Sequence, residues 1–461
     1  MLSSCDKDVI TTDPDVMLGF STDTITFDTV FVSLGSTTKQ FKVYNEELQK
    51  VNIANLQLAG GSNSPFRLNV DGIPGNNFKD VELLAEDSLY VFVEVTIDPT
   101  DANMPFIVED SILFTINGNE QVIQLVAYGQ NAVILNNVSV CDETFTSDLP
   151  YVFFNLVFVP EDCFLNIEEG TEIFVHRRAR FIIEGNLNIN GTAQNQVQFQ
   201  GDRLESFFQE LSAQWTGIEL LRGSEATVNH AFIRNGVYGF VMGSILSDSV
   251  SLSDFTAENA PLLTINNSII QNCFLSGISS FFGNVIATNT LIHTCGENNF
   301  QAGFGGDYQF YHSTLANYGS SSLTHRDPIV SVTNAIQVQE DENTIVIQSR
   351  PASVLFVNSI IHGDAEEEIA IAAVEGQATI ASLFDHCLIS TMLDTSLLIF
   401  DNCIFNPLRQ DTLFVDRRAW DYHLHPLSPA IDGALPTIIE TDLEGNMRTG
   451  EGADIGCYEF Q

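Results

Sequence analysis

The chain has 461 residues, of which 44% are hydrophobic, so it is long enough to bury more than one core. Acidic residues outnumber basic ones by 60 to 18, and the formal charge of −42 repels phosphate and uronate polymers. We therefore expect no nucleic acid partner. No apolar run approaches the roughly eighteen residues that a membrane-spanning helix needs.

The first fifteen residues, 1–15, are predicted to be a tether that follows a lipidation motif. The phrase LSSC, which ends at Cys5, resembles a bacterial lipobox, in which a peptidase cuts before a cysteine that then carries lipid. The apolar segment that precedes such a cysteine is expected upstream of Met1. Residues 6–15 are acidic and have little to bury. The resemblance implies lipid on Cys5, whereas the alternative is a chance match at a disordered end.

Residues 16–130 contain short alternating segments separated by turn residues. We expect strands at 24–32, 40–44, 51–58, 66–70, 88–97, 110–116 and 121–127. Asn117 and Gly118 lie between the last two segments and are a hairpin signal. About seven strands in a region of this length predict a β-sandwich.

Three phrases in this region carry a resemblance to a known family. TFDTVFV begins at Thr26, FKVYN begins at Phe41 and LVAYG begins at Leu125. In this order they resemble bacterial immunoglobulin-like domains of the abnormal-spindle/hydin type. The resemblance implies an N-terminal immunoglobulin-like β-sandwich that acts as a spacer or adhesion module and has no active site of its own.

A seven-residue phrase recurs through residues 131–461. Its copies begin at Asn229, Asn266, Thr288, Tyr311, Val357, Asp385 and Asp401. Two successive steps are 22 and 23 residues, and the next is 46, about twice as long. A period in the low twenties is typical of one turn of a parallel β-helix. The sequence therefore predicts an all-β chain in which a right-handed parallel β-helix with loop insertions and a C-terminal cap follows the sandwich.

Each position of the phrase has its own residue type. The fifth is always large and apolar: Ile233, Ile270, Ile292, Leu315, Ile361, Ile389 and Phe405. The second is Asn or His: His230, Asn267, Asn289, His312, Asn358, His386 and Asn402. Alternate side chains of a strand face opposite ways. We therefore expect the fifth position and the small third position inside the coil, and the second and fourth positions outside.

The fourth position places an apolar stripe on the predicted outer face. The stripe comprises Phe232, Ile269, Leu291, Ile360, Leu388 and Ile404. One interpretation is that these side chains suit strands and are covered by inserted loops. The other is that the stripe docks a partner protein. The long steps predict insertions at 243–261, 323–352 and 363–382.

Both ends of the repeat region carry further resemblance. GTA at Gly191 and WTGI at Trp215 are similar to the first rungs of pectate-lyase-like β-helix proteins. SPAIDG at Ser428, DLEGNMR at Asp442 and DIGCYE at Asp454 resemble the tail of surface β-helix lipoproteins of Bacteroidota-type bacteria. A ligand site on Asp432, Asp442 and Arg448 competes here with a structural interpretation, a capping segment with internal ion pairs.

Chemistry-bearing residues are sparse. Asp385, Asp401 and the neighbouring His386 are weak candidates for catalysis, because β-helix glycosidases use aspartates on adjoining coils. We predict no metal site: CxxC pairs are missing, and His423 with His425 lacks a carboxylate. No cofactor is expected, with calcium at Glu366–Glu368 as the one alternative. Most of the cysteines other than Cys5 are interpreted as buried apolar fillers.

Together these features favour a non-catalytic cell-surface lipoprotein that is a binding or structural subunit of an outer-membrane assembly. Its expected partners are a surface protein complex and a glycan, with membrane contact through the lipid anchor only. The alternative is a polysaccharide lyase or glycoside hydrolase that acts in a β-helix groove. A groove with convergent acids and an arginine would favour the enzyme, and a smooth or loop-covered face would favour binding.

Overall fold

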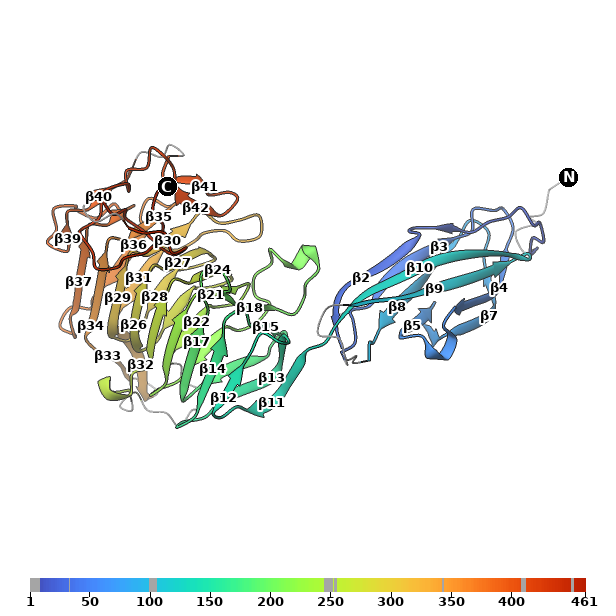
Figure 1. Cartoon of the computed structure of the whole chain (residues 1–461), viewed down its shortest axis with the longest axis horizontal. Helices are drawn as coiled ribbons and strands as arrows, with labels where there is room; N and C mark the ends of the chain where they lie inside the picture. The colour runs from blue at the N-terminus through green and yellow to red at the C-terminus, as the bar shows by residue number, and fades with distance from the viewer. Residues whose placement is uncertain are drawn as a thin grey trace. The chain divides into compact units, whose positions relative to one another are not determined.

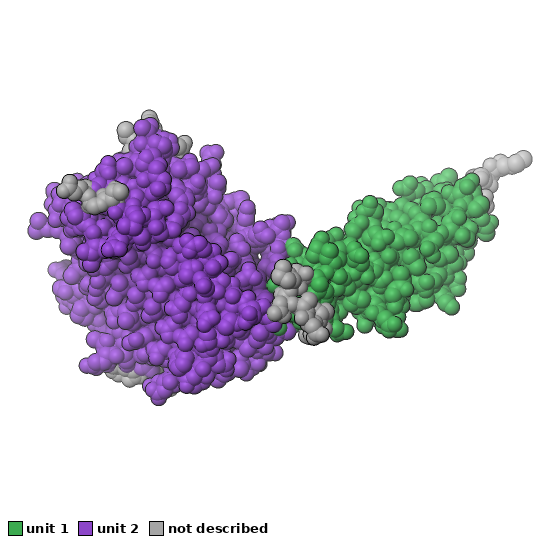
Figure 2. Space-filling model, viewed as in Figure 1, with its two compact units in different colours: residues 1–132 green, residues 133–461 purple. Residues whose placement is uncertain are grey.

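The structure, a computed structural model, describes residues 9–32, 34–98, 106–243, 252, 255–341, 344–407, 412–448 and 452–461. The chain divides into two compact units, residues 1–132 and residues 133–461, coloured green and purple in Figure 2. Each has its own hydrophobic core. None of the described residues forms a helix long and apolar enough to cross a membrane.

The first unit is a sandwich of two five-stranded sheets that share one core, as predicted. The first sheet has the order β1 (Gly19–Phe20), β3 (Lys39–Tyr44), β8 (Ser88–Val95), β5 (Phe66–Val70), β6 (Ile73–Gly75). The second has the order β2 (Thr24–Phe31), β10 (Asn119–Gln130), β9 (Phe106–Ile116), β4 (Val51–Leu58), β7 (Asn77–Leu83). All pairings are antiparallel except that of β2 with β10.

The alternating pattern explains the burial in this unit. In β8 the buried side chains are every second one, Leu89, Val91, Val93 and Val95. Asn117 and Gly118 join β9 to β10 with φ values of 45° and 87°, so the predicted hairpin is confirmed. Strands β1, β6 and β7 were not predicted, because their sequences lack a regular alternation of buried positions.

The second unit is a parallel β-helix built from three stacked files of strands (Figure 1). The first file is a ten-stranded sheet: β12 (Glu143–Phe145), β14 (Phe164–Glu168), β17 (Asn186–Asn190), β20 (Glu225–Asn229), β23 (Leu262–Asn266), β26 (Gly283–Thr288), β29 (Gly306–Tyr311), β34 (Ala352–Val357), β37 (Ile380–Asp385), β39 (Phe400–Asp401). Every strand in this sheet pairs in parallel with the strand one coil away. The ten coils are fewer than the roughly thirteen that length alone predicts at this period, because insertions take up part of the chain.

The other two files are joined through β11 (Val133–Ser139) and β13 (Tyr151–Val159) into one 18-stranded sheet. The second file is β15 (Glu172–Val175), β18 (Val197–Gly201), β21 (Ala231–Arg234), β24 (Ile269–Cys273), β27 (Leu291–Cys295), β30 (Thr314–Asn317), β35 (Ile360–Gly363), β38 (Leu388–Ile389), β40 (Ile404–Phe405). The third is β16 (Arg180–Ile183), β19 (Ile218–Leu220), β22 (Phe240–Met242), β25 (Ile278–Ser280), β28 (Phe300–Ala302), β31 (Val330–Thr333), β36 (Ile369–Ala372).

The fifth position of the phrase forms one interior column, as predicted. Ile270 pairs with Ile292, and Ile292 pairs with Leu315, on successive strands of the second file. All three are fully buried in the same core. The recurring phrases are therefore successive coils stacked along one axis.

The second position of the phrase is not an outward-facing strand position, and that part of the prediction is wrong. Each of these residues lies in the one- or two-residue corner between the first and second files and has a positive φ of 43° to 51°. Asn tolerates this left-handed conformation better than most residues, which explains its recurrence. At the Asn267 corner, the amide of Asn289 donates to Asn267 Oδ1 over 3.0 Å, so neighbouring corners also bond to each other.

Two of the predicted insertions contain strands of the helix itself. The segment 323–352 contains β31 of the third file and, after it, an inserted hairpin, β32 (Ala335–Asp341) with β33 (Thr344–Ser349). The segment 363–382 likewise contains β36 of the third file, so neither is a simple insertion. The segment 243–261 lies partly outside the described residues. Its described part includes the short 3-10 helix η5 (Ala257–Asn259), and two more are η2 (Gly61–Asn63) and η3 (Ser206–Phe208).

A disulfide joins Cys141 to Cys163, which corrects the interpretation of both as apolar fillers. Their separation of 22 residues is one coil of the repeat, so the bond links the first coil to the second. Cys273, Cys295, Cys387 and Cys457 are buried thiols, as predicted. The bond was missed because the two cysteines lie in turns, where the recurring phrase is absent.

After the last coil, residues 412–448 and 452–461 return along the outside of the second file and include a small hairpin, β41 (Phe414–Asp416) with β42 (Asp421–Leu424). We call the described part of this stretch the C-terminal segment. Its apolar side chains form a separate core with residues of the second file, which include Leu291, Ile360 and Leu388. The segment therefore covers part of the outer face of the β-helix.

Candidate functional site

The apolar stripe lies under the C-terminal segment. Leu291, Ile360 and Leu388 are buried there, and Ile269 and Ile404 are partly buried against the same core. Phe232 is half-buried and stacks under the guanidinium of Arg234, 5.2 Å from the ring centre. The covering chain is this protein's own tail rather than an inserted loop. The buried members of the stripe consequently have no surface to offer a partner protein, and the docking interpretation fails for them.

Beside the covered stripe lies a groove of about 1140 Å³. One wall comes from the second file and the turns that follow it, with Tyr318, His362, Asp364 and Thr391. The opposite wall comes from the C-terminal segment, with Phe414, Asp416, Arg417 and Arg418. The groove thus brings together residues that are about one hundred positions apart in the sequence.

Three side chains that line this groove contact one another. The hydroxyl of Tyr318 is 2.6 Å from Nδ1 of His362, and the guanidinium of Arg417 lies 4.8 Å from the centre of the Tyr318 ring. Burial raises the pKa of the Tyr318 hydroxyl far above its usual range, so it stays protonated. Burial, together with the charge of Arg417, lowers the pKa of His362 to about 4. At neutral pH the pair is therefore uncharged beside a fixed cation.

A buried histidine fixes the rim of the groove. His325 Nδ1 lies 2.7 Å from Asp364 Oδ1, and Nε2 lies 2.7 Å from the carbonyl of Asp327 and 3.3 Å from Glu368 Oε2. Burial alone would lower the pKa of His325, but the hydrogen bonds that its ring donates to Asp364 and Glu368 outweigh burial and raise that pKa to about 10. The ring is thus an imidazolium that joins the loop after β30 to the turn after β35.

His325, Asp364 and Glu368 are also a group that could hold a metal ion. Both ring nitrogens of His325, however, face oxygen acceptors at hydrogen-bond distance, which requires a proton on each. A metal needs one of those nitrogens deprotonated. The geometry therefore suits a proton better than a metal. Glu368, which belongs to the glutamate run considered for calcium, is fully buried.

A second hollow of about 560 Å³ continues from the groove and shares Tyr318, Asp364, Arg417 and Arg418 with it. It adds Trp420, which is half-buried, and the polar residues Glu210 and Ser320. An aromatic ring beside hydroxyl, carboxylate and guanidinium groups is the combination that sugar-binding sites need, because sugars present both apolar C–H faces and hydroxyl groups.

The sequence-predicted catalytic candidates lie elsewhere. Asp385 and Asp401 are register partners at the ends of β37 and β39, and His386 is the corner residue that follows Asp385. His386 Nδ1 is 2.6 Å from Asp385 Oδ1. None of the three lines the groove or the second hollow. The lipidation candidate, Cys5, lies outside the described residues.

The tail residues form a cap. Arg448 is buried, donates to Glu459 Oε2 over 3.1 Å, and reaches the corner residue Asn289 over 3.0 Å. Asp442 accepts hydrogen bonds from the backbone N–H groups of Glu444, Asn446 and Glu459. These internal contacts engage the Asp442 carboxylate and the terminal nitrogens of Arg448, and they leave the buried Arg448 Nε without a hydrogen-bond partner among the described residues. The capping interpretation therefore describes Asp442 and Arg448.

His423 and His425 both make contacts within the C-terminal segment. His423 lies 2.6 Å from Asp421 Oδ1 through Nδ1 and 3.2 Å from Glu444 Oε1 through Nε2. His425 Nδ1 accepts a hydrogen bond from the backbone of Leu427 instead. The two rings thus have different partners and do not chelate together.

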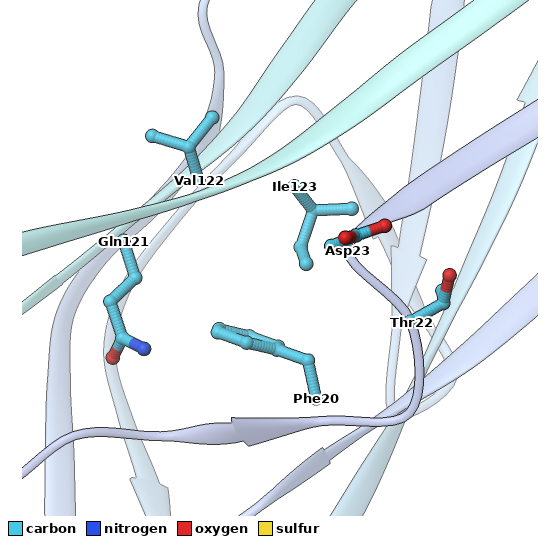
Figure 3. A pocket seen from close by; sticks show the side chains of 6 residues that line it. All are labelled: Phe20, Thr22, Asp23, Gln121, Val122 and Ile123. Atoms are coloured by element: carbon cyan, nitrogen blue, oxygen red, sulfur yellow. The ribbon is translucent and has the colours of Figure 1, made fainter.

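The first unit carries one shallow hollow of about 630 Å³, shown in Figure 3. It is lined by Phe20, Thr22, Asp23, Gln121, Val122 and Ile123. The Gln121 amide is already engaged, because it donates to the Leu18 carbonyl and accepts from the Leu18 N–H. With its amide committed, the hollow offers little beyond the Asp23 carboxylate, and we assign it no role.

No protein-family model and no curated protein matches this chain. A solved structure described as a family 123 glycoside hydrolase from Clostridium perfringens, studied for glycolipid glycan hydrolysis, aligns over 28% of this chain and 30% of that chain. The identity is 14% and the TM-score is 0.19, which is too low to support an argument about fold or function.

Sequence reasoning missed the groove because no single segment contains it. Tyr318 follows a copy of the phrase by one residue, and Arg417 and Trp420 lie past the last copy. A usable signal was the aromatic and arginine content of RRAWDY at Arg417–Tyr422, in a region otherwise rich in acids.

Proposed function

We propose that this chain is a non-catalytic cell-surface lipoprotein whose β-helix binds a glycan in the groove between the second file and the C-terminal segment. The observation that carries the proposal is the groove itself, with Tyr318, Arg417 and Trp420 beside carboxylates and hydroxyl groups. Arginine and carboxylate side chains hydrogen-bond sugar hydroxyls, and aromatic rings pack on the apolar face of a sugar ring.

Binding is favoured over catalysis because the polar groups in the groove are poorly suited to acid–base chemistry. Asp364 is paired with His325, and the pKa values of Tyr318 and His362 lie far from neutral. General acids and bases work best with a pKa near the operating pH. The two predicted marks point in different directions. The C-terminal segment covers the neighbouring outer face of the helix, the predicted mark of a binding protein, whereas the acids and Arg417 of the groove match the predicted mark of an enzyme.

The binding proposal is tested with the purified full chain, a panel of neutral and anionic oligosaccharides, and isothermal titration calorimetry. We expect Arg417→Ala to weaken the binding of a positive ligand roughly tenfold or more, since a hydrogen bond to a charged group contributes about 1.5–3 kcal/mol. Arg177→Ala is the matched control, because this exposed arginine lies in the turn between β15 and β16, away from the groove. The proposal would be contradicted if Arg417→Ala bound the ligand as tightly as the native chain, or if both variants lost affinity equally.

The anchoring part of the proposal rests on the lipobox resemblance at Cys5. The first unit would then be a spacer of the immunoglobulin-like kind between the membrane and the β-helix. Mass spectrometry of the protein expressed in a bacterial host with its upstream coding region is expected to find acyl chains on Cys5. The Cys5→Ala variant should be unmodified and absent from the membrane fraction, and an unmodified Cys5 would remove the anchor.

A second candidate, a polysaccharide lyase or glycoside hydrolase, is favoured by the acids and Arg417 of the groove and by one hydrogen bond beside them. The Tyr318 hydroxyl and His362 share a hydrogen bond beside Arg417, which is a set of proton-transfer groups next to a cation. Release of reducing ends or unsaturated products from the same oligosaccharides, with and without a chelator, tests this candidate. Turnover that disappears in Tyr318→Phe would replace the binding proposal with the enzymatic one.

A further inference from the structure

Two pairs of thiols stack on neighbouring coils, and they differ in exposure. Cys273 and Cys295 are register partners on β24 and β27 and are fully buried. Cys387 and Cys403 each precede a strand by one residue, and those strands, β38 and β40, pair Leu388 with Ile404. Cys387 is buried, whereas Cys403 is partly exposed.

Cys387 and Cys403 make equivalent contacts on two successive coils. Cys387 Sγ lies 3.4 Å from the carbonyls of Phe356 and Asp385. Cys403 Sγ lies 3.3 Å from the carbonyls of Phe384 and Asp401, which are the register partners of those residues. Equal contacts mean equal side-chain orientations, so the two sulfur atoms stand one above the other.

Cys403 lies in the last coil, where a disulfide bond to the preceding coil would stabilise the end of the β-helix. In a solenoid each coil is stabilised by its neighbours, and an end coil has only one. The first coil is already linked to the second by the disulfide between Cys141 and Cys163, whose Cα atoms are 4.8 Å apart. Parallel strands stack at about that spacing, which lies within the range for a disulfide.

We propose that Cys387 and Cys403 form a reversible disulfide that links the last coil of the β-helix to the coil before it. It would be the counterpart, at the C-terminal end, of the bond between Cys141 and Cys163. The proposal does not rest on the proposed function. Ile404 and Asn406, on the coil that the bond would fix, line the groove, so the bond would also hold that part of its wall.

The chemistry is thiol–disulfide exchange with an oxidant of the disulfide class. The Cys403 thiolate attacks one sulfur of that disulfide, forms a mixed disulfide and releases one thiol. The Cys387 thiolate then attacks the Cys403 sulfur and releases the second thiol. Two electrons pass from the cysteines to the oxidant, and the two cysteine protons end on the released thiols.

Cys403 is suited to the first step. It is the more exposed of the two, and the hydrogen bond from Cys387 lowers the pKa of Cys403 despite its partial burial. Burial raises the pKa of the Cys387 thiol far above its usual range, so Cys387 is the resolving thiol rather than the attacking one. Cys273 has a raised pKa as well, from its contact with Cys295 and from burial, and offers no exposed thiol.

Trypsin separates the two pairs, which makes the test direct. Residues 235–326 contain Cys273 and Cys295 as their cysteines and end at Arg326. Residues 327–409 contain Cys387 and Cys403 and stay joined, since Arg350 precedes a proline that blocks cleavage. The full chain is equilibrated in buffers of increasing oxidised-to-reduced glutathione ratio, quenched in acid, unfolded, alkylated, digested and weighed by mass spectrometry.

We expect the 327–409 peptide to lose alkylation at both cysteines as the buffer becomes oxidising, while the 235–326 peptide stays alkylated at both. In Cys387→Ser, Cys403 should instead carry glutathione, because the resolving thiol is gone. In Cys403→Ser, Cys387 should remain alkylated in every buffer. Full alkylation of the 327–409 peptide in every buffer would overturn the proposal, as would oxidation of both peptides at the same ratio.

Discussion

At the scale of single residues, the corner positions show why a pattern in sequence need not mean what it first suggests. A column of Asn and His resembles an exposed polar row, yet each member lies at the corner between the first and second files and has a left-handed backbone conformation. The left-handed backbone conformation, rather than the side chain's polarity, explains most of the choice. The side-chain hydrogen bonds between coils add to it.

This account makes a prediction at Asn267, which has a φ of 48° and is only half-buried. Asn267→Ala should lower the free energy of unfolding by about 1–2 kcal/mol from the left-handed backbone cost and by about 1 kcal/mol from the lost hydrogen bond to Asn289. Asn267→Gly should lower it less, since glycine has no Cβ to strain. Urea unfolding of both variants measures the difference, and equal losses would show that backbone conformation does not matter here.

His325 makes a prediction about pH. Its pKa is raised to about 10 in the folded chain, compared with about 6.5 for an unperturbed histidine. The contacts with Asp364 and Glu368 therefore contribute their full stability below about pH 6.5 and lose it as the pH rises through 10. The difference in unfolding free energy between the native chain and His325→Asn should be large at pH 6 and shrink toward pH 10.

The matched control for this histidine is His425→Asn, because the Nδ1 atom of His425 accepts a backbone hydrogen bond and pairs with no carboxylate. Its effect on stability should not decline over the same alkaline range. Denaturant unfolding at several pH values gives both curves. A His325→Asn difference that grows with pH would mean that the ring is neutral in the folded chain, and it would reopen the metal interpretation of this cluster.

At the scale of elements, strands in the interior could be predicted from sequence and their outer coverings could not. Ile292 recurs in a phrase with a fixed period, so its place in one interior column follows from the stacking of like residues. Leu291 is also apolar, but the phrase that contains it does not indicate which segment covers its side chain. That depends on the C-terminal segment, which is more than one hundred residues away in sequence.

The groove was missed for the same reason. The sequence directed attention to Asp385 and Asp401, which are neighbours in the repeat, and their pairing across coils is real. The groove is instead formed where Tyr318 meets Arg417. A contact between segments this far apart leaves no periodic pattern in the sequence. It becomes visible only in the structure, where the C-terminal segment packs over the second file.

The covering of the stripe can be tested with one pair of substitutions. Ile360 and Ile269 occupy the same position of the phrase, but Ile360 is fully buried under the C-terminal segment and Ile269 is partly exposed. Ile360→Ala should cost about 2–5 kcal/mol of unfolding free energy, the usual range for a buried aliphatic side chain. Ile269→Ala should cost clearly less. Thermal or urea unfolding measures both, and equal small losses would mean that the segment does not pack on the stripe.

At the scale of the whole molecule, the charge of −42 is the dominant long-range feature. Few of the acids are neutralised locally, because 60 acidic residues share 18 lysines and arginines. Several of those cations have fixed partners, such as Arg180 with Glu219 and Arg448 with Glu459. Most of the remaining acidic charge therefore repels itself across the surface of the folded chain, and the unfolded chain relieves that repulsion by expanding.

Because added salt screens this repulsion, the melting temperature should rise with ionic strength. The Debye length falls from about 30 Å at 0.01 M to about 10 Å at 0.1 M salt, so most of the gain should come within that range. Differential scanning fluorimetry in sodium chloride measures it, with sucrose at equal osmolarity as the control for general exclusion effects. A melting temperature that falls or stays constant as salt is added would mean that the acidic surface has no net cost in the folded chain, and that local pairing outweighs repulsion across the molecule.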